Sequence, residues 1–169
     1  MIRSAKILLL GDIAVGKTSL AKRLVFNRFD SDYKTTIGVN VLSHEVTTED
    51  AGQTESMRLV IWDTDGDFSH AIFNTTYIVG ASGAIVVADA TRPATIDRMA
   101  TLIAAFEDRF PGRPVSAVLN KTDLVSPEQS VDLKPASKFR DLVRTSALTG
   151  AGVAEVFVNM AHAIRRRGL

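Results

Sequence analysis

The sequence predicts an α/β fold in which helices cover both faces of a mostly parallel sheet. Short β-rich runs alternate with helical runs along the chain, an order typical of parallel sheets. Four of the β-rich runs are continuously apolar, as expected for strands that are buried on both faces. A fifth run is more polar and leads into a loop, which favours an antiparallel strand at the sheet edge.

The strands follow from these runs in chain order. The polar run, residues 40–48, is expected to form a hairpin with residues 57–63 across a polar loop at residues 49–56. The continuously apolar strands are expected at residues 5–10, 59–63, 83–89 and 114–120.

Helices are expected between and after the strands, where apolar residues recur at helical spacing. Leu20, Leu24 and Val25 mark a helix over residues 17–27. The second helix carries Met99, Leu102, Ile103 and Phe106, and the third, over residues 153–167, carries Val156, Phe157, Met160, Ala161 and Ile164.

Length and composition limit the class of protein. The 169 residues predict a single domain over residues 1–169, and 46% hydrophobic with 23% charged residues is an ordinary globular composition. Lys and Arg number 20 against 19 Asp and Glu, so net charge gives no reason to expect nucleic acid as a partner.

The chain contains no cysteine, which removes disulfides, thiolate catalysis and thiolate metal ligands. The N-terminal residues lack the long apolar core of a signal peptide. Ile2 excludes N-myristoylation, and without cysteine neither prenylation nor palmitoylation is possible. We therefore expect no lipid anchor in this chain and a cytoplasmic location.

Residues 11–18, GDIAVGKT, match the phosphate-binding pattern G-x-x-x-x-G-K-[ST] between a predicted strand and a predicted helix. Backbone N–H groups at the start of the helix are expected to bind phosphates, and Lys17 adds a positive charge for the β- and γ-phosphates. The hydroxyl of Thr18 is expected to bind Mg²⁺. A plain strand-to-helix turn is the alternative, which the Lys-Thr ending disfavours. The predicted contacts are Ile13, Ala14, Val15, Gly16, Lys17, Thr18 and Ser19.

The motif D-x-x-G begins at Asp63, the last residue of an apolar strand, and ends at Gly66. An acidic residue at a strand end can hold Mg²⁺ through a water, and the N–H of Gly66 can contact a γ-phosphate. D-x-x-G is common by chance, but here it follows the phosphate loop by about 45 residues, which makes it a strong signal.

A third motif, NKTD, follows the last apolar strand. The carboxylate of Asp123 can accept hydrogen bonds from both N1–H and the exocyclic amine of guanine, a donor pair that adenine lacks. Asn120 is expected to brace the loop, and the stem of Lys121 to cover the purine. The segment Ser146, Ala147 and Leu148 is expected to complete the base site, with the Ala147 N–H on the guanine carbonyl.

These motifs, in this order over nearly the whole chain, resemble the Ras superfamily of small GTPases, and TTIGV with IWDT is most similar to the Rab branch. The resemblance implies a P-loop NTPase fold with a six-stranded sheet and one antiparallel edge strand. It implies GTP and GDP as ligands with Mg²⁺, an effector protein that reads switch I at about 29–42 and switch II at about 64–79, and an exchange factor or activator. It also implies that Thr36 binds Mg²⁺ and the γ-phosphate, that Phe29 lies against guanine and that Tyr33 covers the phosphates.

Two departures from the family's pattern bear on catalysis. Where the family has the water-orienting glutamine of D-T-A-G-Q, this chain has Asp67, and Asp65 replaces the alanine. A carboxylate is repelled by phosphate and has no amide donor, so slow hydrolysis is predicted even if Asp67 points into solvent. Ile13, where glycine or serine is usual, is expected to hinder an arginine finger. The candidate catalytic residues are Lys17, Thr36, Gly66 and Asp67, and the candidate metal ligands are Thr18, Thr36 and Asp63.

Further departures concern partners and anchoring. Val41 stands where Rab proteins carry an aromatic residue of the effector-reading triad, although Trp62 and Tyr77 match the other two. Leu148 replaces the family's lysine in S-A-K, which removes a cation near the base. The missing cysteine anchor fits a prokaryotic relative or a truncated chain.

Two functions follow from the sequence. The first is a guanine-nucleotide switch with weak GTPase activity, preferred because the Mg²⁺ and triphosphate residues are intact. The alternative is a non-hydrolysing GTP- or GDP-binding interaction module. A small nucleoside kinase is disfavoured because the sequence has no Arg cluster typical of a lid and NKTD selects guanine.

Overall fold

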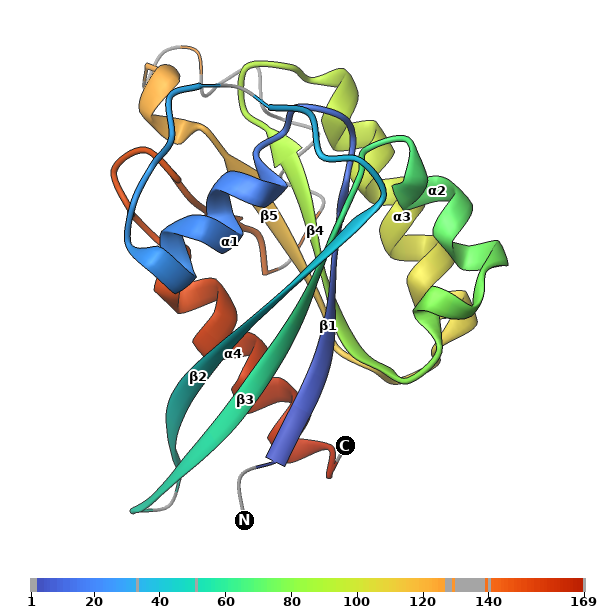
Figure 1. Ribbon diagram of the computed structural model, residues 1–169, viewed down its shortest axis with the longest axis vertical. Helices are drawn as coiled ribbons and strands as arrows, with labels where there is room; N and C mark the ends of the chain where they lie inside the picture. The colour runs from blue at the N-terminus through green and yellow to red at the C-terminus, as the bar shows by residue number, and fades with distance from the viewer. Residues whose placement is uncertain are drawn as a thin grey trace.

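The computed structural model describes residues 3–32, 34–50, 52–126, 129, 139 and 141–168, without the side chain of Asp50. These residues form a six-stranded sheet with the strand order β2-β3-β1-β4-β5-β6 (Figure 1). The strands are β1 (Arg3–Gly11), β2 (Val39–Asp50), β3 (Gln53–Thr64), β4 (Ala81–Asp89), β5 (Val115–Asn120) and β6 (Val143–Arg144). Only β2 and β3 pair antiparallel among these strands, with β2 at the edge, so the predicted fold class is confirmed.

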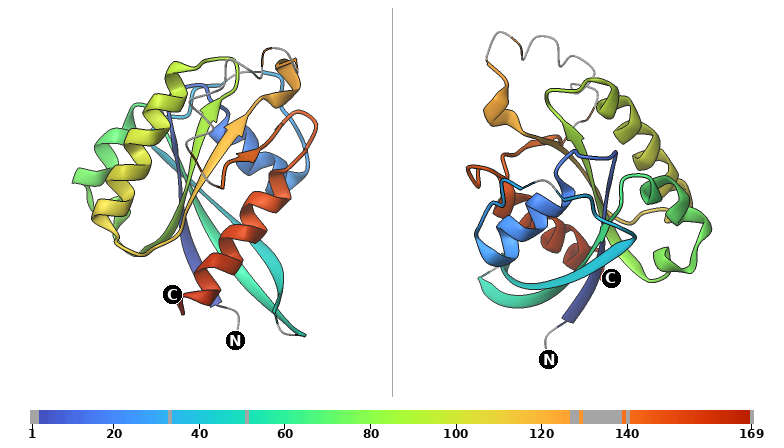
Figure 2. Two further views of the ribbon diagram at one scale, coloured as in Figure 1. Left: turned by 180° about the vertical axis from the view of Figure 1, so that it is seen from behind. Right: turned by 45° about the horizontal axis from the view of Figure 1, so that its top comes forward.

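Helices lie on both faces of the sheet. The helices α1 and α4 cover one face and α2 and α3 the other (Figures 1 and 2). Their bounds are α1 (Lys17–Phe26), α2 (Phe68–Ala71), α3 (Ala94–Arg109) and α4 (Val153–Arg166), with short 3-10 helices η1 (Ile72–Asn74), η2 (Thr76–Ile78) and η3 (Thr122–Leu124). Within the described ranges, every helix is too short or too polar to cross a lipid bilayer.

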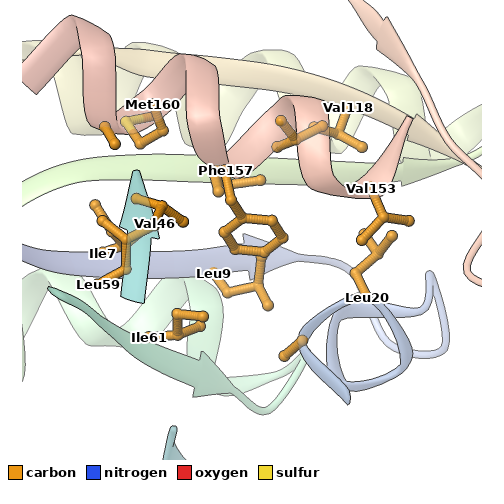
Figure 3. Close-up of a cluster of buried hydrophobic side chains, with 14 of the residues drawn as sticks. Ile7, Leu9, Leu20, Val46, Leu59, Ile61, Val118, Val153, Phe157 and Met160 are labelled. Carbon is orange, nitrogen blue, oxygen red and sulfur yellow. The ribbon is translucent and has the colours of Figure 1, made fainter. Parts of the chain in front are cut away.

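The apolar runs of the strands are explained by two cores, one on each face of the sheet. In β1, Ile7 and Leu9 point into the core under α1 and α4, whereas Leu8 and Leu10 point into the core under α3. All four side chains are fully buried, because successive residues of a strand point to opposite faces. Figure 3 shows the first core, in which Phe157 of α4 lies among side chains of the sheet and α1.

The hairpin of β2 and β3 differs from the expected one. The prediction of a loop over residues 49–56 is wrong, because the antiparallel ladder continues to the pair Asp50 and Gln53. The two-residue connection contains Gly52, whose φ of 78° is in the left-handed region that glycine enters without strain. Because the turn at Gly52 is tight, the polar residues on either side of it belong to the two strands, although their composition predicts a loop.

The fold positions a site at one edge of the sheet. The strands β1, β3, β4 and β5 run parallel and end at Gly11, Thr64, Asp89 and Asn120. All three sequence motifs begin at or next to these ends, and ligands of open α/β sheets bind outside the carboxyl ends of the strands.

Candidate functional site

A cavity of about 690 Å³ lies at this edge, within the roughly 300–1,000 Å³ usual for small-molecule sites. Residues from all three motifs and from the segment after α1 line it. The predicted site residues on its wall are Ile13, Ala14, Gly16, Lys17, Thr18, Ser19, Phe29, Thr36, Gly66, Asn120, Lys121, Asp123, Ala147 and Leu148. Val15, Asp63, Asp67 and Ser146 are not on the wall, and Tyr33 lies outside the described residues.

The start of α1 presents backbone donors to this cavity. Gly16 precedes the helix with a φ of 100°, and its helix start has no side-chain cap. A Cβ on Gly16 would lie 2.3 Å from Nδ2 of Asn120, so both the backbone conformation and the space require glycine. Uncapped N–H groups at the positive end of a helix form a ready site for an anion such as phosphate.

Lys17, the first residue of α1, is only 6% exposed. Its amine donates to the carbonyls of Gly11 at 2.9 Å and Asp12 at 2.7 Å, which holds it inside the phosphate loop. Burial lowers the pKa of Lys17 to about 8, although the charges of Asp63, Asp12 and Asp65 act in the opposite direction. A phosphate bound beside Lys17 would favour its charged form.

The three candidate metal ligands, Thr18, Thr36 and Asp63, meet at the hydroxyl of Thr18. The hydroxyl of Thr18 lies 2.6 Å from the hydroxyl of Thr36 and donates to Oδ2 of Asp63 at 2.6 Å. Burial raises the pKa of Asp63 to about 6, against the lowering effects of Thr18 and Lys17. Among the described residues, Oδ1 of Asp63 is the one buried side-chain oxygen or nitrogen without a hydrogen-bond partner.

This oxygen-only set fits Mg²⁺, a cation that prefers hydroxyl, carboxylate, phosphate and water oxygens. The described residues contain no group of three or more His, Cys, Asp or Glu side chains placed to hold a metal. A metal here would therefore take oxygens from phosphate and water besides those of the protein.

At the other end of the cavity, Asn120 organises the expected base site. Its Oδ1 accepts hydrogen bonds from the Thr145 hydroxyl at 3.0 Å and from the Ala147 N–H at 3.2 Å. Asp123 is exposed on the cavity wall, and its Oδ1 accepts from the Ser146 hydroxyl at 2.6 Å. Ser146 therefore supports the carboxylate of Asp123 although it is not itself on the wall.

Three consecutive carbonyls of the phosphate loop accept hydrogen bonds from side chains at or just after the ends of β4 and β5. Arg92 donates to Ile13 at 2.5 Å, Lys121 to Ala14 at 2.7 Å and Asn120 to Val15 at 3.0 Å. These bonds join the phosphate loop to the expected base site.

Asp89 connects two of these donors, and sequence reasoning missed it. Its Oδ2 lies 2.7 Å from Nζ of Lys121 and 3.3 Å from Nε of Arg92. Burial raises the pKa of Asp89, but hydrogen bonds from Lys121 and Thr91 outweigh it and hold this pKa below its ordinary value. Asp89 is the last residue of the expected strand 83–89, as Asp63 is of the expected strand 59–63, so the same signal was available, whereas nothing in the sequence pattern points to Arg92.

Arg23 is a second residue that the sequence did not reveal. From α1 it donates to the carbonyls of Ala147 at 2.8 Å and Leu148 at 2.6 Å. The helix that begins at the phosphate loop thus also supports the loop at the expected base site. Only tertiary contact brings these segments together, since they are more than 120 residues apart.

The two acidic residues after Asp63 are positioned differently. Asp65 is half-buried and lines the cavity, whereas Asp67 is exposed and precedes α2. The N–H of Asp67 donates to Oδ1 of Asp65 at 3.0 Å. The exposure of Asp67 is what the alternative of a solvent-facing Asp67 expects.

An apolar surface adjoins the cavity on the side of β2 and β3. Ile37, Val41 and Tyr77 are exposed, and the rings of Trp62 and Tyr77 lie with their centroids 5.9 Å apart. The amine of Lys6 lies 3.6 Å from the Trp62 ring centroid and also donates to the Tyr77 carbonyl. Trp62 and Tyr77, which match the effector-reading residues of the Rab pattern, are thus adjacent, and Val41 is exposed as a small aliphatic residue.

Comparison with known proteins agrees with this geometry. Residues 6–166 match the Ras family. Ras-related protein Rab-1C of Dictyostelium discoideum is 33% identical over 168 residues, which cover 95% of this chain and 81% of the relative. Ras-related protein RABA3 of Arabidopsis thaliana is 32% identical over 168 residues, covering 96% of this chain and 69% of the relative. The chain therefore belongs to the Ras family and is a Rab-like small GTPase.

Proposed function

We propose that this protein is a guanine-nucleotide switch that binds GTP and GDP with Mg²⁺ and hydrolyses GTP slowly. Membership of the Ras family supports its general class, a GTP-binding GTPase of the switch type. The observation that carries slow hydrolysis is the position of Asp67, an exposed carboxylate outside the cavity at the place of the water-orienting glutamine.

The phosphate end of the cavity supports binding of a triphosphate. The N–H groups of the phosphate loop and the amine of Lys17 would bind the phosphate oxygens. Thr18, Thr36 and Asp63 would hold Mg²⁺, which when bound neutralises charge on the β- and γ-phosphates. Thr36 comes from the expected switch I, so its approach to Thr18 connects that segment to the phosphate site.

The base end supports selection of guanine. Asp123 presents a carboxylate that can accept from the two adjacent donors of guanine. Asn120 is held between Val15, Thr145 and Ala147, so the loop that carries Asp123 is fixed relative to the phosphate loop. Adenine lacks the donor pair, so a site built this way would bind it more weakly.

Two features of the site disfavour hydrolysis. The Asp67 carboxylate has no N–H with which to orient the attacking water, and it is exposed outside the cavity. Position 67 would therefore not orient the water as the family's glutamine does. Ile13 lines the cavity with a partly exposed branched side chain, which narrows the approach of an arginine finger from an activator. Such a finger accelerates hydrolysis by roughly 10³- to 10⁵-fold in related mechanisms.

Switching would act through contacts between the two expected switch segments. The N–H of Asp65 donates to the carbonyl of Gly38 at 2.8 Å, and Thr36 contacts Thr18. Loss of the γ-phosphate would remove the ligand that both segments approach, and an effector protein would read the change on the adjoining surface of Ile37, Val41, Trp62 and Tyr77.

Nucleotide identification followed by single-turnover hydrolysis tests this function. The purified protein is denatured, the released nucleotide is identified, and the GTP-loaded protein is then followed over time with Mg²⁺. We expect guanine nucleotide and slow release of phosphate, and Asp67→Gln should raise the rate by about tenfold or more at unchanged nucleotide affinity.

The outcomes separate the candidate functions. Hydrolysis as fast in the wild type as in Asp67→Gln would contradict slow hydrolysis caused by position 67. Bound guanine nucleotide without any hydrolysis in either protein would support the non-hydrolysing interaction module instead. Adenine nucleotide in the released fraction would contradict the guanine site.

A further inference from the structure

Asp65 lines the cavity at the end expected to bind phosphate. Asp65 is on the wall together with Lys17 and Gly66, the two residues expected to contact a γ-phosphate. Its charge acts on Lys17, whose pKa it raises together with Asp63 and Asp12. Asp67 carries the same charge two residues later but lies outside the wall, so only one of the two acidic replacements bears on the cavity.

Several hydrogen bonds hold Asp65 in this position. Its N–H donates to the Gly38 carbonyl at 2.8 Å, and its carbonyl accepts from the Ser69 N–H at 2.9 Å and the Ser69 hydroxyl at 3.1 Å. Its Oδ1 accepts from the Asp67 N–H at 3.0 Å. Ser69 is fully buried, so the backbone of Asp65 is anchored from the protein interior, and the bond from the Asp67 N–H holds its carboxylate.

Gly66, the residue after Asp65, lies close to the phosphate loop. A Cβ on Gly66 would lie 2.4 Å from both Cα and N of Ile13, so the backbone after Asp65 lies directly against the loop. The segment that carries the Asp65 charge is therefore part of the wall around the terminal phosphate position rather than a distant neighbour.

No cation within the described ranges forms an ion pair with Asp65. The amine of Lys17 is bound to the Gly11 and Asp12 carbonyls, and Arg92 is bound to Ile13 and Asp89. The charge of Asp65 is thus reduced by solvent and by distant cations, but no neighbouring side chain neutralises it directly.

We propose that Asp65 makes this site favour GDP over GTP by electrostatic repulsion of the γ-phosphate. This inference rests on the proposed guanine-nucleotide function. GTP differs from GDP by one phosphate, expected beside Lys17 and Gly66, and a like charge on the same partly buried wall opposes its binding. GDP ends before this position, so its affinity depends much less on Asp65. The free protein therefore holds GDP preferentially, and its GTP state depends on nucleotide excess or a partner.

Calorimetric titration with GDP and with a non-hydrolysable GTP analogue, in Mg²⁺ buffer on nucleotide-free protein, tests the preference. The variant Asp65→Asn keeps the oxygen that accepts from Asp67 but removes the charge. We expect it to raise the affinity for the GTP analogue by about 10- to 100-fold and to change the GDP affinity by less than about threefold.

Two further variants identify the source of the effect. Asp97→Asn and Asp108→Asn each remove one charge from the exposed surface of α3. Both should leave the ratio of the two affinities within about twofold of wild type, because exposed charges are screened. An unchanged ratio in Asp65→Asn, or an equal shift in Asp97→Asn or Asp108→Asn, would overturn the inference. Failure of the wild type to bind either nucleotide would overturn the proposed function itself.

Discussion

Nζ of Lys121 lies 2.7 Å from Oδ2 of Asp89, and the same amine lies 2.7 Å from the Ala14 carbonyl. One side chain of the NKTD motif therefore contacts both the end of β4 and the phosphate loop. Arg92 extends the unit to Ile13, since it contacts Asp89 and donates to the Ile13 carbonyl. The phosphate and base ends of the cavity are thus connected through hydrogen-bonded side chains as well as through the sheet.

Replacing Asp89 by Asn is expected to lower the free energy of unfolding by about 1–3 kcal/mol at neutral pH, because a charged, almost fully buried partner of Lys121 is lost. The folded state holds the Asp89 pKa below its ordinary value of 3.8. Its ionised form therefore stabilises the fold above that value, and this contribution disappears as pH falls through the lower folded-state pKa.

Urea unfolding of the wild type and Asp89→Asn between pH 7 and pH 3 measures this contribution. The difference between the two free energies of unfolding should have its largest value at neutral pH and decrease below about pH 4. Asp108→Asn, an exposed change on α3, should stay within about 0.5 kcal/mol of wild type at neutral pH. A difference that grows as pH falls would contradict the assigned sign.

Arg92→Ala is expected to accelerate GDP dissociation by about 3- to 10-fold, because the Ile13 carbonyl loses a charge-assisted hydrogen bond and the phosphate loop becomes less restrained. The expected acceleration is modest because the Arg92 side chain is partly exposed, where solvent weakens its hydrogen bond. Release of a fluorescent GDP analogue into excess unlabelled GDP gives the rate. Arg166→Ala, on the exposed end of α4, is the control, and equal rates for both variants would count against the contact.

Gly66→Ala is expected to displace the segment that follows β3, since the new Cβ would lie 2.4 Å from Cα and N of Ile13. Neither backbone atom can move away as a flexible side chain could. Binding of a GTP analogue should weaken by about tenfold or more while the fold stays intact, as monitored by circular dichroism. Gly80→Ala is the control for steric crowding, because no atom of the described residues beyond its chain neighbours lies within 4 Å of the Cβ position there. Its positive φ of 77° means that this alanine adds backbone strain without a close contact. Wild-type binding by Gly66→Ala would show that the close approach is not required.

Phe157→Ala is expected to reduce the free energy of unfolding by about 3–5 kcal/mol, because it leaves a cavity in the core between α4 and the sheet. Urea unfolding in the presence of excess GDP, and again in its absence, separates core stability from ligand stabilisation. Phe157→Leu retains most of the side-chain volume and should cost clearly less. A loss below about 1 kcal/mol for the alanine variant would contradict the packing in Figure 3.

Motif order and apolar periodicity predicted strands at β1 to β5, the helices α1, α3 and α4, and most of the predicted site residues found on the cavity wall, but neither β6 nor α2. They succeeded because a parallel strand buried on both faces must be apolar, as in Ile7 to Leu10, and because its carboxyl end carries the polar residues that follow. The polar residues of the β2–β3 turn were misassigned, since only the cross-strand pairing, not composition, extends those strands to Asp50 and Gln53.

The sequence by itself determined the family, the fold and the set of candidate ligands, because these depend on residue types at fixed spacing along the chain. Tertiary structure alone decided that Asp65 lines the cavity while Asp67 is exposed outside its wall, and that Arg23, Asp89 and Arg92 support the loops around it. Side-chain direction and contacts between distant segments depend on how loops pack against the sheet, which local pattern does not encode. Electrostatic repulsion and hydrogen bonding act over a few ångströms in space, so their partners become known only when the chain is folded.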